Sequence, residues 1–242
     1  MDEAVVDLFG YHALQLGLPE LDALRSNRMP HRWLGCEAVP GAPPVAGGRA
    51  VALHCEFDAL PLPAASVDLL VLPHTLELSR DPHQTLREAE RVLVPEGRLL
   101  VSGLNPASLW GLRQRAGHVR RGLGLGRDEP MYLPASGDFL GYWRLRDWLR
   151  LLSFEVEAGR FGCWRPPLKS QRWLDRWDWM DGLGDRWWPV LGAVYFVVAV
   201  KRVRGMRLVG MAKPARRNVR AAQAVVTSRQ RPLATIERTG KA

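Results

Sequence analysis

The segment from Glu56 to Pro106 constrains the fold of this chain more than any other. Apolar runs at Val67–Leu72 and Leu99–Val101 have the length of buried strands and are bounded by turn residues. Between them, Asp81 and Pro82 mark a helix start, because an Asp side chain can cap the first turn and proline lacks an N–H that this turn leaves unpaired. A strand, a helix and a second strand in this order predict a parallel sheet with a crossover helix.

The rest of the chain supplies further elements of the same kind. Apolar runs predict strands at 12–16, 33–37, 50–55, 154–156 and 193–200, and helical spacing of apolar residues predicts a helix over Leu145–Leu152. Residues 18–28 are interpreted as a further helix. Residues 39–49, which are rich in proline and glycine, are expected to form a loop, and residues 113–127 a mobile loop with a basic face.

The charge of the chain is concentrated at its carboxyl end. Residues 201–242 hold 12 Lys/Arg and one acid, a net +11, so the other 200 residues carry 34 − 12 = 22 Lys/Arg and 25 − 1 = 24 Asp/Glu, a net −2. We therefore expect a near-neutral domain over residues 1–203 and a basic, disordered tail over residues 204–242. Such a tail is either solvated without a partner or makes weak, salt-sensitive contacts with nucleic acid or anionic lipid.

The cysteines indicate a reducing compartment. Cys36, Cys55 and Cys163 are odd in number and lack metal-ligand spacing, which argues against a disulfide framework or a zinc site and favours the cytoplasm. The sequence does not show the basic region followed by an apolar region that is typical of a secretory signal. The longest apolar run, residues 187–200, is interrupted by Pro189 and is too short to cross a membrane, so it predicts a turn followed by a buried strand.

The segment from Glu56 to Ser102 resembles the class I S-adenosylmethionine-dependent methyltransferases, and in particular the type 11 group. The residues that carry the resemblance are Glu56, Leu60-Pro61, Val67-Asp68, Leu76-Glu77, Arg91–Gly97 and Leu99–Ser102. The resemblance implies an α/β fold with a Rossmann-like, seven-stranded, mostly parallel sheet and helices on both faces. It also implies S-adenosylmethionine as cofactor and methyl transfer to an unidentified acceptor.

The same resemblance assigns cofactor-binding residues at the carboxyl ends of the first strands, where ligands of open α/β sheets bind. It implies that a first-loop glycine lets the backbone approach the cofactor, that one acid accepts from the ribose hydroxyls, and that further residues surround the adenine. At these positions the chain has Gly17, Glu37, Glu56, Phe57, Asp58 and Leu72. Glu56 and Asp58 are alternative partners of the adenine amino group, while Gly17 and Glu37 are equally well explained as a turn residue and a surface acid.

The glycine-rich loop departs from the family pattern of an acid followed by Gly-x-Gly-x-Gly. Gln15 stands at the acid position, and Pro19 and Leu21 replace the second and third glycines. Gln15 cannot pair with the cofactor ammonium as a carboxylate would, and Leu21 would crowd the loop. These changes motivate the alternative of a catalytically inactive methyltransferase-like scaffold, or of a polyanion (RNA)-binding protein acting through its basic tail.

His74 is the candidate catalytic residue. Methyl transfer from a sulfonium depends mainly on alignment and proximity, and a general base is needed only where the acceptor must lose a proton. His74 follows the fourth predicted strand, and its alternative role is that of a strand-end histidine satisfied by backbone groups. Asn105 either lines the acceptor pocket or forms a turn, Asp68 is expected to orient local backbone, and Glu88 and Arg91 are expected to form a solvated pair of little energetic value.

Tryptophans gather near the carboxyl end of the domain. Trp173, Trp177 and Met180 recur at helical spacing, and Trp187-Trp188 follow. This pattern favours an amphipathic helix packed on the sheet. The alternatives are an apolar acceptor pocket and a membrane-surface contact.

Overall fold

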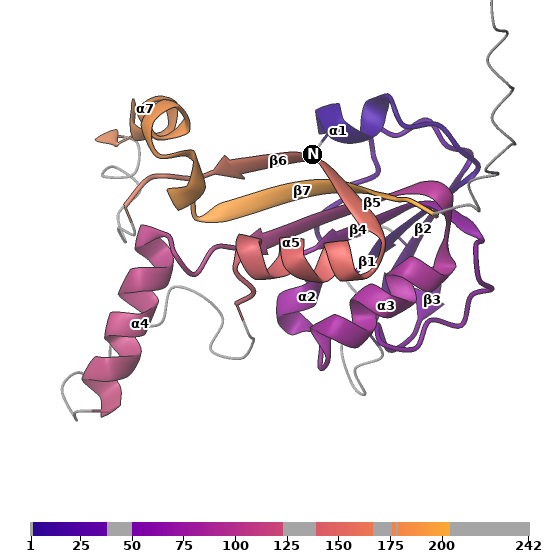
Figure 1. Cartoon of the computed structure of the whole chain (residues 1–242), viewed down its shortest axis with the longest axis horizontal. Coiled ribbons are helices and arrows are strands. Elements are labelled where there is room, and N and C mark those ends of the chain that lie inside the picture. Colours follow the sequence, from indigo (N-terminus) through magenta and orange to yellow (C-terminus); the bar gives the residue numbers. More distant parts are fainter. Residues whose placement is uncertain (1, 38–49, 123–138, 167–175, 178, 204–242) are drawn as a thin grey trace, which may run out of the picture. The chain divides into compact units, whose positions relative to one another are not determined.

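Within residues 2–37, 50–122, 139–166, 176–177 and 179–203, which the computed structural model describes, seven strands form one sheet in the order β3-β2-β1-β4-β5-β7-β6 (Figure 1). The strands are β1 (His12–Leu16), β2 (His31–Cys36), β3 (Leu53–His54), β4 (Val67–Pro73), β5 (Leu93–Leu104), β6 (Phe154–Gly162) and β7 (Val194–Lys201). β7 runs antiparallel to both β5 and β6, and the other neighbours pair in parallel. The predicted Rossmann-like, mostly parallel seven-stranded sheet is confirmed.

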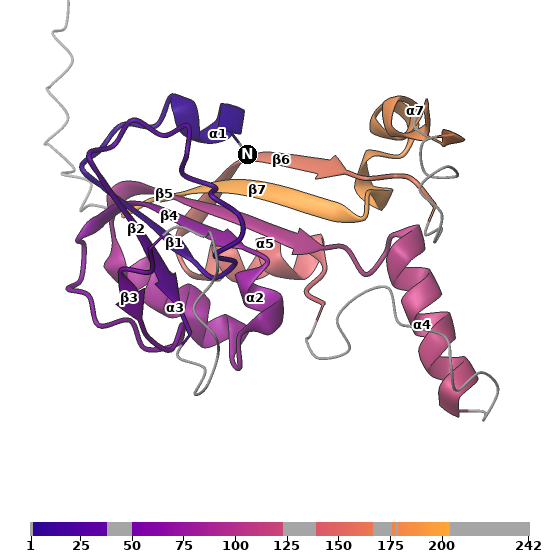
Figure 2. The ribbon, with the colours of Figure 1, turned by 180° about the vertical axis from the view of Figure 1, so that it is seen from behind.

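The helices lie on the two faces of the sheet and beyond one of its ends. They are α1 (Asp2–Val6), α2 (Thr75–Leu78), α3 (Pro82–Val92), α4 (Leu109–Gly122), α5 (Tyr142–Leu151) and α7 (Trp179–Trp187), with a 3-10 turn, η1 (Pro189–Leu191). In Figures 1 and 2, α3 and α5 cover one face and α1 lies over the other. Both views place α4 and α7 together at the end of the sheet where β7 begins.

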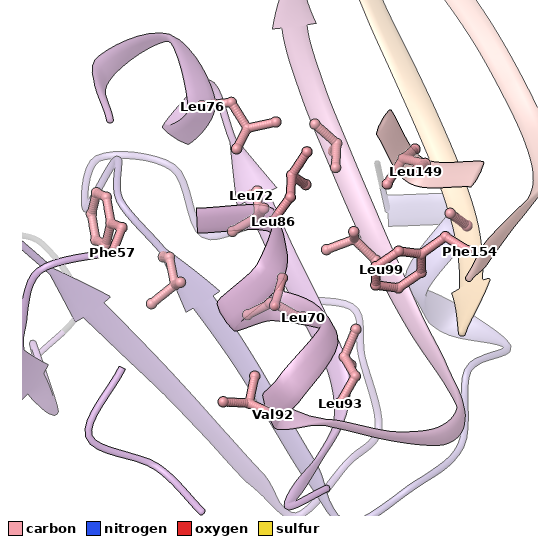
Figure 3. Close-up of a cluster of buried hydrophobic side chains, with 14 of the residues drawn as sticks. Phe57, Leu70, Leu72, Leu76, Leu86, Val92, Leu93, Leu99, Leu149 and Phe154 are labelled. Atoms are coloured by element: carbon pink, nitrogen blue, oxygen red, sulfur yellow. The ribbon is translucent and has the colours of Figure 1, made fainter. Parts of the chain in front are cut away.

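Alternation along the strands builds a core on each face of the sheet, because successive side chains of a strand point to opposite faces. Leu70, Leu72 and Leu99 point into the larger cluster, which contains Leu86 of α3 and Leu149 of α5 (Figure 3). The smaller cluster on the other face joins strand residues to α1 and to the segment between β1 and β2. Its members are Val5, Ala13, Ala23, Leu24, Met29, Leu69, Val71, Leu100 and Val198.

The crossover helix α3 is capped at both ends. The predicted cap Asp81 accepts hydrogen bonds from the backbone N–H groups of His83 and Gln84, each at 3.0 Å. At the other end, the ammonium of Lys201 at the end of β7 donates to the carbonyls of Glu90 (2.5 Å) and Leu93 (2.9 Å). These two carbonyls belong to the last turn and the C-cap, where intrahelical donors run out, so the last strand closes the end of the crossover helix.

Two predicted segments differ from the structure. Residues 18–28 form turns instead of a helix, and residues 113–122 belong to helix α4 instead of a loop. The third strand is also shorter than predicted, and Pro95-Glu96-Gly97 lie within β5 where the register with β4 shifts. The predicted loops at 39–49 and 123–127, and the tail at 204–242, lie outside the described residues.

Candidate functional site

A pocket opens at the carboxyl ends of β2 and β3. It is a small, open pocket with a cavity volume of about 30 Å³, lined by Glu37, Glu56, Phe57, Asp58, Ser79 and Arg80. The strand order reverses between the neighbouring strands β1 and β4, and such a switch point is the usual ligand position of an open α/β sheet. The structure therefore brings together four of the six residues assigned to the cofactor and adds two from the start of the connection to α3.

Gly17 lies beside this pocket in a conformation that favours glycine. Its φ is +78°, and a Cβ added there would lie 3.2 Å from Oγ1 of Thr75 and 3.7 Å from Cζ of Phe57. The Thr75 hydroxyl donates to the carbonyl of Leu16 at 2.5 Å, which ties the end of β1 to the start of α2. The loop after β1 thus passes close to the pocket wall, as a backbone-only approach to a ligand requires.

Gln15 is fully buried and holds the loop that follows it. Its amide nitrogen lies within hydrogen-bond distance of the carbonyls of Gly17 (3.2 Å), Leu18 (3.1 Å) and Leu21 (2.6 Å). Its amide oxygen accepts from the backbone N–H of Ala23 at 3.0 Å. These bonds engage carbonyls that a helix over residues 18–28 would need, which is the physical reason that the predicted helix is replaced by turns.

Glu88 and Arg91 of α3 fix the chain that leaves the pocket. The Glu88 carboxylate accepts from the N–H of Leu60 at 3.1 Å, and the Arg91 guanidinium donates to the carbonyls of Leu60 (2.9 Å) and Leu62 (2.8 Å). The two side chains also form an ion pair at 2.8 Å, and their hydrogen bond lowers the pKa of Glu88. The expectation of a solvated pair of little value is wrong, because both charges serve as partners for loop backbone.

Two of the residues assigned to the cofactor, Leu72 and Phe57, belong to the hydrophobic core, and Phe57 also forms part of the pocket wall. Leu72 is completely buried in the larger cluster, and Phe57 is 6% exposed and contributes to the same cluster while lining the pocket (Figure 3). Cys55, just before the pocket, is buried as well, and this burial raises the pKa of its thiol to about 11. The thiol therefore stays protonated at neutral pH and is a poor nucleophile.

His74 is held at the carboxyl end of β4 in a strained conformation next to a buried acid. Its φ is +54°, in the left-handed region, and its N–H donates to the carbonyl of Ser102 at 2.9 Å. Its Nδ1 lies 3.1 Å from Oε2 of Glu77, whose side chain is 6% exposed. A carboxylate only accepts hydrogen bonds, so Nδ1 is the donor in this contact. His74 is not among the residues that line the pocket.

Glu77 was not singled out as a functional residue from the sequence. In the structure its carboxylate contacts both His74 and the backbone at the end of β5. Its second oxygen accepts from the N–H of Leu104, which ties α2 to the end of β5. The hydroxyls of Ser102 and Tyr195 are buried and lack a hydrogen-bond partner among the described residues. Burial, followed by the charge of Glu77, raises the pKa of Tyr195. The signal in the sequence was the separation of three residues between His74, which precedes α2, and Glu77 within this short helix.

Asn105 and Asp68 have structural contacts. The Asn105 amide donates to the carbonyls of Val190 (2.7 Å) and Gly192 (3.0 Å), so it joins the end of β5 to η1. Asp68 lies near the opposite end of the sheet, where its carboxylate accepts from the N–H groups of Tyr11 and His12 at 2.9 Å each. Asp68 therefore orients backbone, as expected, but the backbone is that of the start of β1, more than fifty residues earlier in the chain, and not local.

Comparison with known proteins agrees with this geometry. A family model described as a methyltransferase domain matches residues 23–101. The Escherichia coli K12 protein YafS is 32% identical over 228 residues, which cover 92% of this chain and 81% of the relative. A malonyl-[acyl-carrier protein] O-methyltransferase from Methylovorus sp. strain MP688 is 40% identical over 65 residues, 27% of this chain and 22% of that protein.

Among solved structures, a SAM-dependent methyltransferase from Thermotoga maritima, described as a possible histamine N-methyltransferase, has a similar fold. It superposes with a TM-score of 0.53 at 16% identity, covering 83% of this chain and 88% of that chain. Residues 23–101 therefore match a methyltransferase domain, and the fold is that of the class I S-adenosylmethionine-dependent methyltransferases. The similarity to YafS extends over nearly the whole chain. No helix in the described part of the chain is long and apolar enough to cross a membrane.

Proposed function

We propose that this methyltransferase holds the adenosine part of its cofactor in the pocket after β2 and β3 and moves the acceptor proton to His74. The pocket that unites Glu37, Glu56 and Asp58 at the switch point is the observation that carries the proposal. Carboxylate oxygens are acceptors, and the ribose hydroxyls and the adenine amino group of the cofactor are donors. The donor and acceptor chemistry of the pocket therefore suits the adenosine half of the molecule.

In this proposal Glu37 accepts from the ribose, and Glu56 or Asp58 accepts from the adenine amino group. Gly17 provides a close backbone approach, with Phe57 and Leu72 forming apolar wall and support. The cofactor supplies a methyl group on a positively charged sulfur, which needs alignment with a nucleophile and little covalent assistance. Gln15 is occupied by its own loop, so recognition of the methionine end falls to backbone groups of residues 17–18.

His74 acts as general base when the acceptor nucleophile carries a proton. A bound cofactor would supply the methyl group to the acceptor nucleophile, and Nε2 of His74 would take up the proton that the nucleophile loses. Glu77 positions the ring, since its contact with Nδ1 keeps the Nε2 lone pair available. The contact of Glu77 with the N–H of Leu104 fixes the carboxylate in turn.

Calorimetry with S-adenosylhomocysteine tests the cofactor site. We expect the wild-type chain to bind, and Glu37→Gln and Glu56→Gln each to weaken binding roughly tenfold, because each loses a charged acceptor. Glu157→Gln, an exposed acid on β6 paired with Arg98, is the matched control and should bind like the wild type. Absence of heat and of a thermal shift at high ligand concentration would overturn the proposal and favour the inactive scaffold, which the engagement of Gln15 by its own loop supports.

The role of His74 is tested separately by nitrogen-15 NMR of its ring. The shifts should report a proton on Nδ1 in the wild type, and Glu77→Gln should give a mixture of tautomers while cofactor binding is unchanged. Transfer of label from methyl-tritiated cofactor to a metabolite extract should fall about a hundredfold or more in His74→Ala. A proton on Nε2 in the wild type would remove His74 from this role.

The proposal also covers the position of the methyl acceptor and the cellular compartment of the protein. We place the acceptor beside the carboxyl ends of β4 and β5, where His74 lies, and the protein in the cytoplasm, where its three thiols remain reduced.

A further inference from the structure

Helix α4 carries an apolar stripe that faces solvent. Leu109, Leu112 and Val119 are 46%, 62% and 62% exposed, and they lie three and seven residues apart, on one face of the helix with the exposed Ala116. On another side of the helix, Gly111 and Gln114 are buried. The 14 residues of α4 include four arginines and no acid. The helix is therefore amphipathic and cationic.

The neighbouring segment exposes tryptophans. Trp179 and Trp187 of α7 are 56% and 68% exposed and lie on one face of the helix, eight positions apart. Trp188, before η1, is 59% exposed. The interpretation of the tryptophans as packed on the sheet is wrong for Trp187 and Trp188. Trp177 and Met180 are half-buried, and Trp173 lies outside the described residues.

The two apolar surfaces belong to one end of the molecule. The indole N–H of Trp110 in α4 donates to the carbonyl of Arg165 at 2.7 Å, and the Arg165 guanidinium pairs with Asp181 of α7 at 2.7 Å. The indole N–H of Trp164 donates to the carbonyl of Trp188 at 2.9 Å, so the segment before Pro166 contacts both helices. Figures 1 and 2 place α4 and α7 beyond the same end of the sheet.

We propose that this end of the protein, defined by Leu109, Leu112, Val119, Trp179, Trp187 and Trp188, docks on the surface of an anionic lipid bilayer. Tryptophan is enriched at the boundary between lipid head groups and acyl chains, and arginine stems cover apolar surface while their charges reach the phosphates. A helix with leucine and valine on one face and only basic charges matches the pattern of interfacial helices. Its charge complements an anionic lipid surface and would oppose the docking of a second copy of the same helix.

The proposal does not depend on methyl transfer, and vesicle flotation of the full-length protein tests it. We expect the wild type to float with phosphatidylcholine vesicles that contain phosphatidylglycerol, and not with phosphatidylcholine alone. Leu112→Glu and Trp187→Glu should each lower the partition coefficient roughly tenfold or more, since each places a carboxylate in the contact. Leu151→Glu is the matched control and should float like the wild type. Leu151 is 76% exposed at the end of α5, beside the other end of β6 and β7.

Because all variants keep residues 204–242, the basic tail contributes equally to each. Equal flotation of the wild type and of all three variants would overturn the proposal and assign lipid binding to the tail. Absence of flotation, accompanied by light scattering that shows a dimer broken by Leu112→Glu, would overturn it in favour of self-association. Circular dichroism of each variant excludes unfolding as the cause of lost binding.

Discussion

Gln15 occupies the position at which the resembled family carries an acid, and its amide serves three carbonyls and one N–H of the following loop. Only a side chain with both donors and an acceptor can do this, and glutamine has both. The departure from the family pattern is therefore accompanied by a different loop, in which turns replace the helix expected after the first strand. The residue and the loop conformation depend on each other.

We predict that Gln15→Glu destabilises the protein although it restores the family residue. A carboxylate would face the carbonyls of Gly17, Leu18 and Leu21 without a proton to donate, so the free energy of unfolding should fall by about 2–4 kcal/mol. Urea unfolding measures this loss. Gln84→Glu in the first turn of α3 is the control, and it should change stability by less than about 0.5 kcal/mol because a negative charge suits a helix amino end. Full stability of Gln15→Glu would show that the loop can rearrange around a carboxylate.

At the scale of elements, the connection from β3 to β4 depends on two side chains of α3. Glu88 and Arg91 supply partners for the backbone of Leu60 and Leu62, in a stretch where β3 has ended and β4 has not begun. The same stretch follows directly on the pocket residues. The charged side chains of the crossover helix α3 therefore hydrogen-bond to the backbone of the loop that follows the pocket residues.

We predict that the Glu88 contribution to stability disappears in acid. Because the folded-state pKa of Glu88 lies below its ordinary value near 4.5, the unfolded chain takes up the proton first as the pH falls. The contribution is therefore fully present above that ordinary value and is lost as the pH falls through the folded-state pKa. At neutral pH, Glu88→Gln should cost about 1–2 kcal/mol, with solvent around the partly exposed Arg91 limiting the effect.

Urea unfolding of the wild type and Glu88→Gln across this pH range provides the measurement, and their stabilities should converge in acid. Glu157→Gln removes an exposed partner of Arg98 and should cost less than about 0.5 kcal/mol at neutral pH. A cost for Glu88→Gln that persists unchanged below the folded-state pKa would assign its effect to packing.

The strands and the crossover helix followed from the sequence because their signals are local. Apolar runs such as Val67–Leu72 define strands, and the side chain of Asp81 caps the helix that begins beside it. The segments whose structure was predicted wrongly depend on partners that are distant in the sequence or were not expected. Residues 18–28 have helical composition, but Gln15 takes their carbonyls, and the arginine-rich α4 is held through Trp110 by a residue 55 positions away.

Some residues of the candidate site could likewise be proposed from the sequence, whereas others could not. Glu37, Glu56 and Asp58 could be proposed from the family resemblance, because they stand where the family has its cofactor-binding residues, and all three line one pocket. The burial of Leu72 and the contact of Glu77 with the N–H of Leu104 depend on packing between elements, which spacing alone does not specify. The Glu88–Arg91 pair was misread for the same reason, since its partners lie about thirty residues upstream.

At the scale of the whole molecule, we propose that residues 1–203 fold without the basic tail. Both hydrophobic clusters lie within the residues up to Val200. Removal of residues 204–242 takes away 10 Lys/Arg and one acid, so the formal charge falls from +9 to 0. We predict an unchanged circular dichroism spectrum and thermal midpoint, together with loss of retention on a cation exchanger at neutral pH. A drop in the thermal midpoint on truncation would show that the tail contributes to the fold.

The position of β7 has a consequence for biosynthesis. β7 lies between β5 and β6, and it is the strand with which β6 pairs. Until residues 194–201 have been made, the outer edge of β5 is open and β6 has no neighbour, so the nascent chain presents exposed strand edges that favour aggregation. The insertion of this last strand completes the sheet and, through Lys201, closes α3 in one event. Newly made chains are therefore expected to need protection by chaperones until the end of the domain has been synthesised.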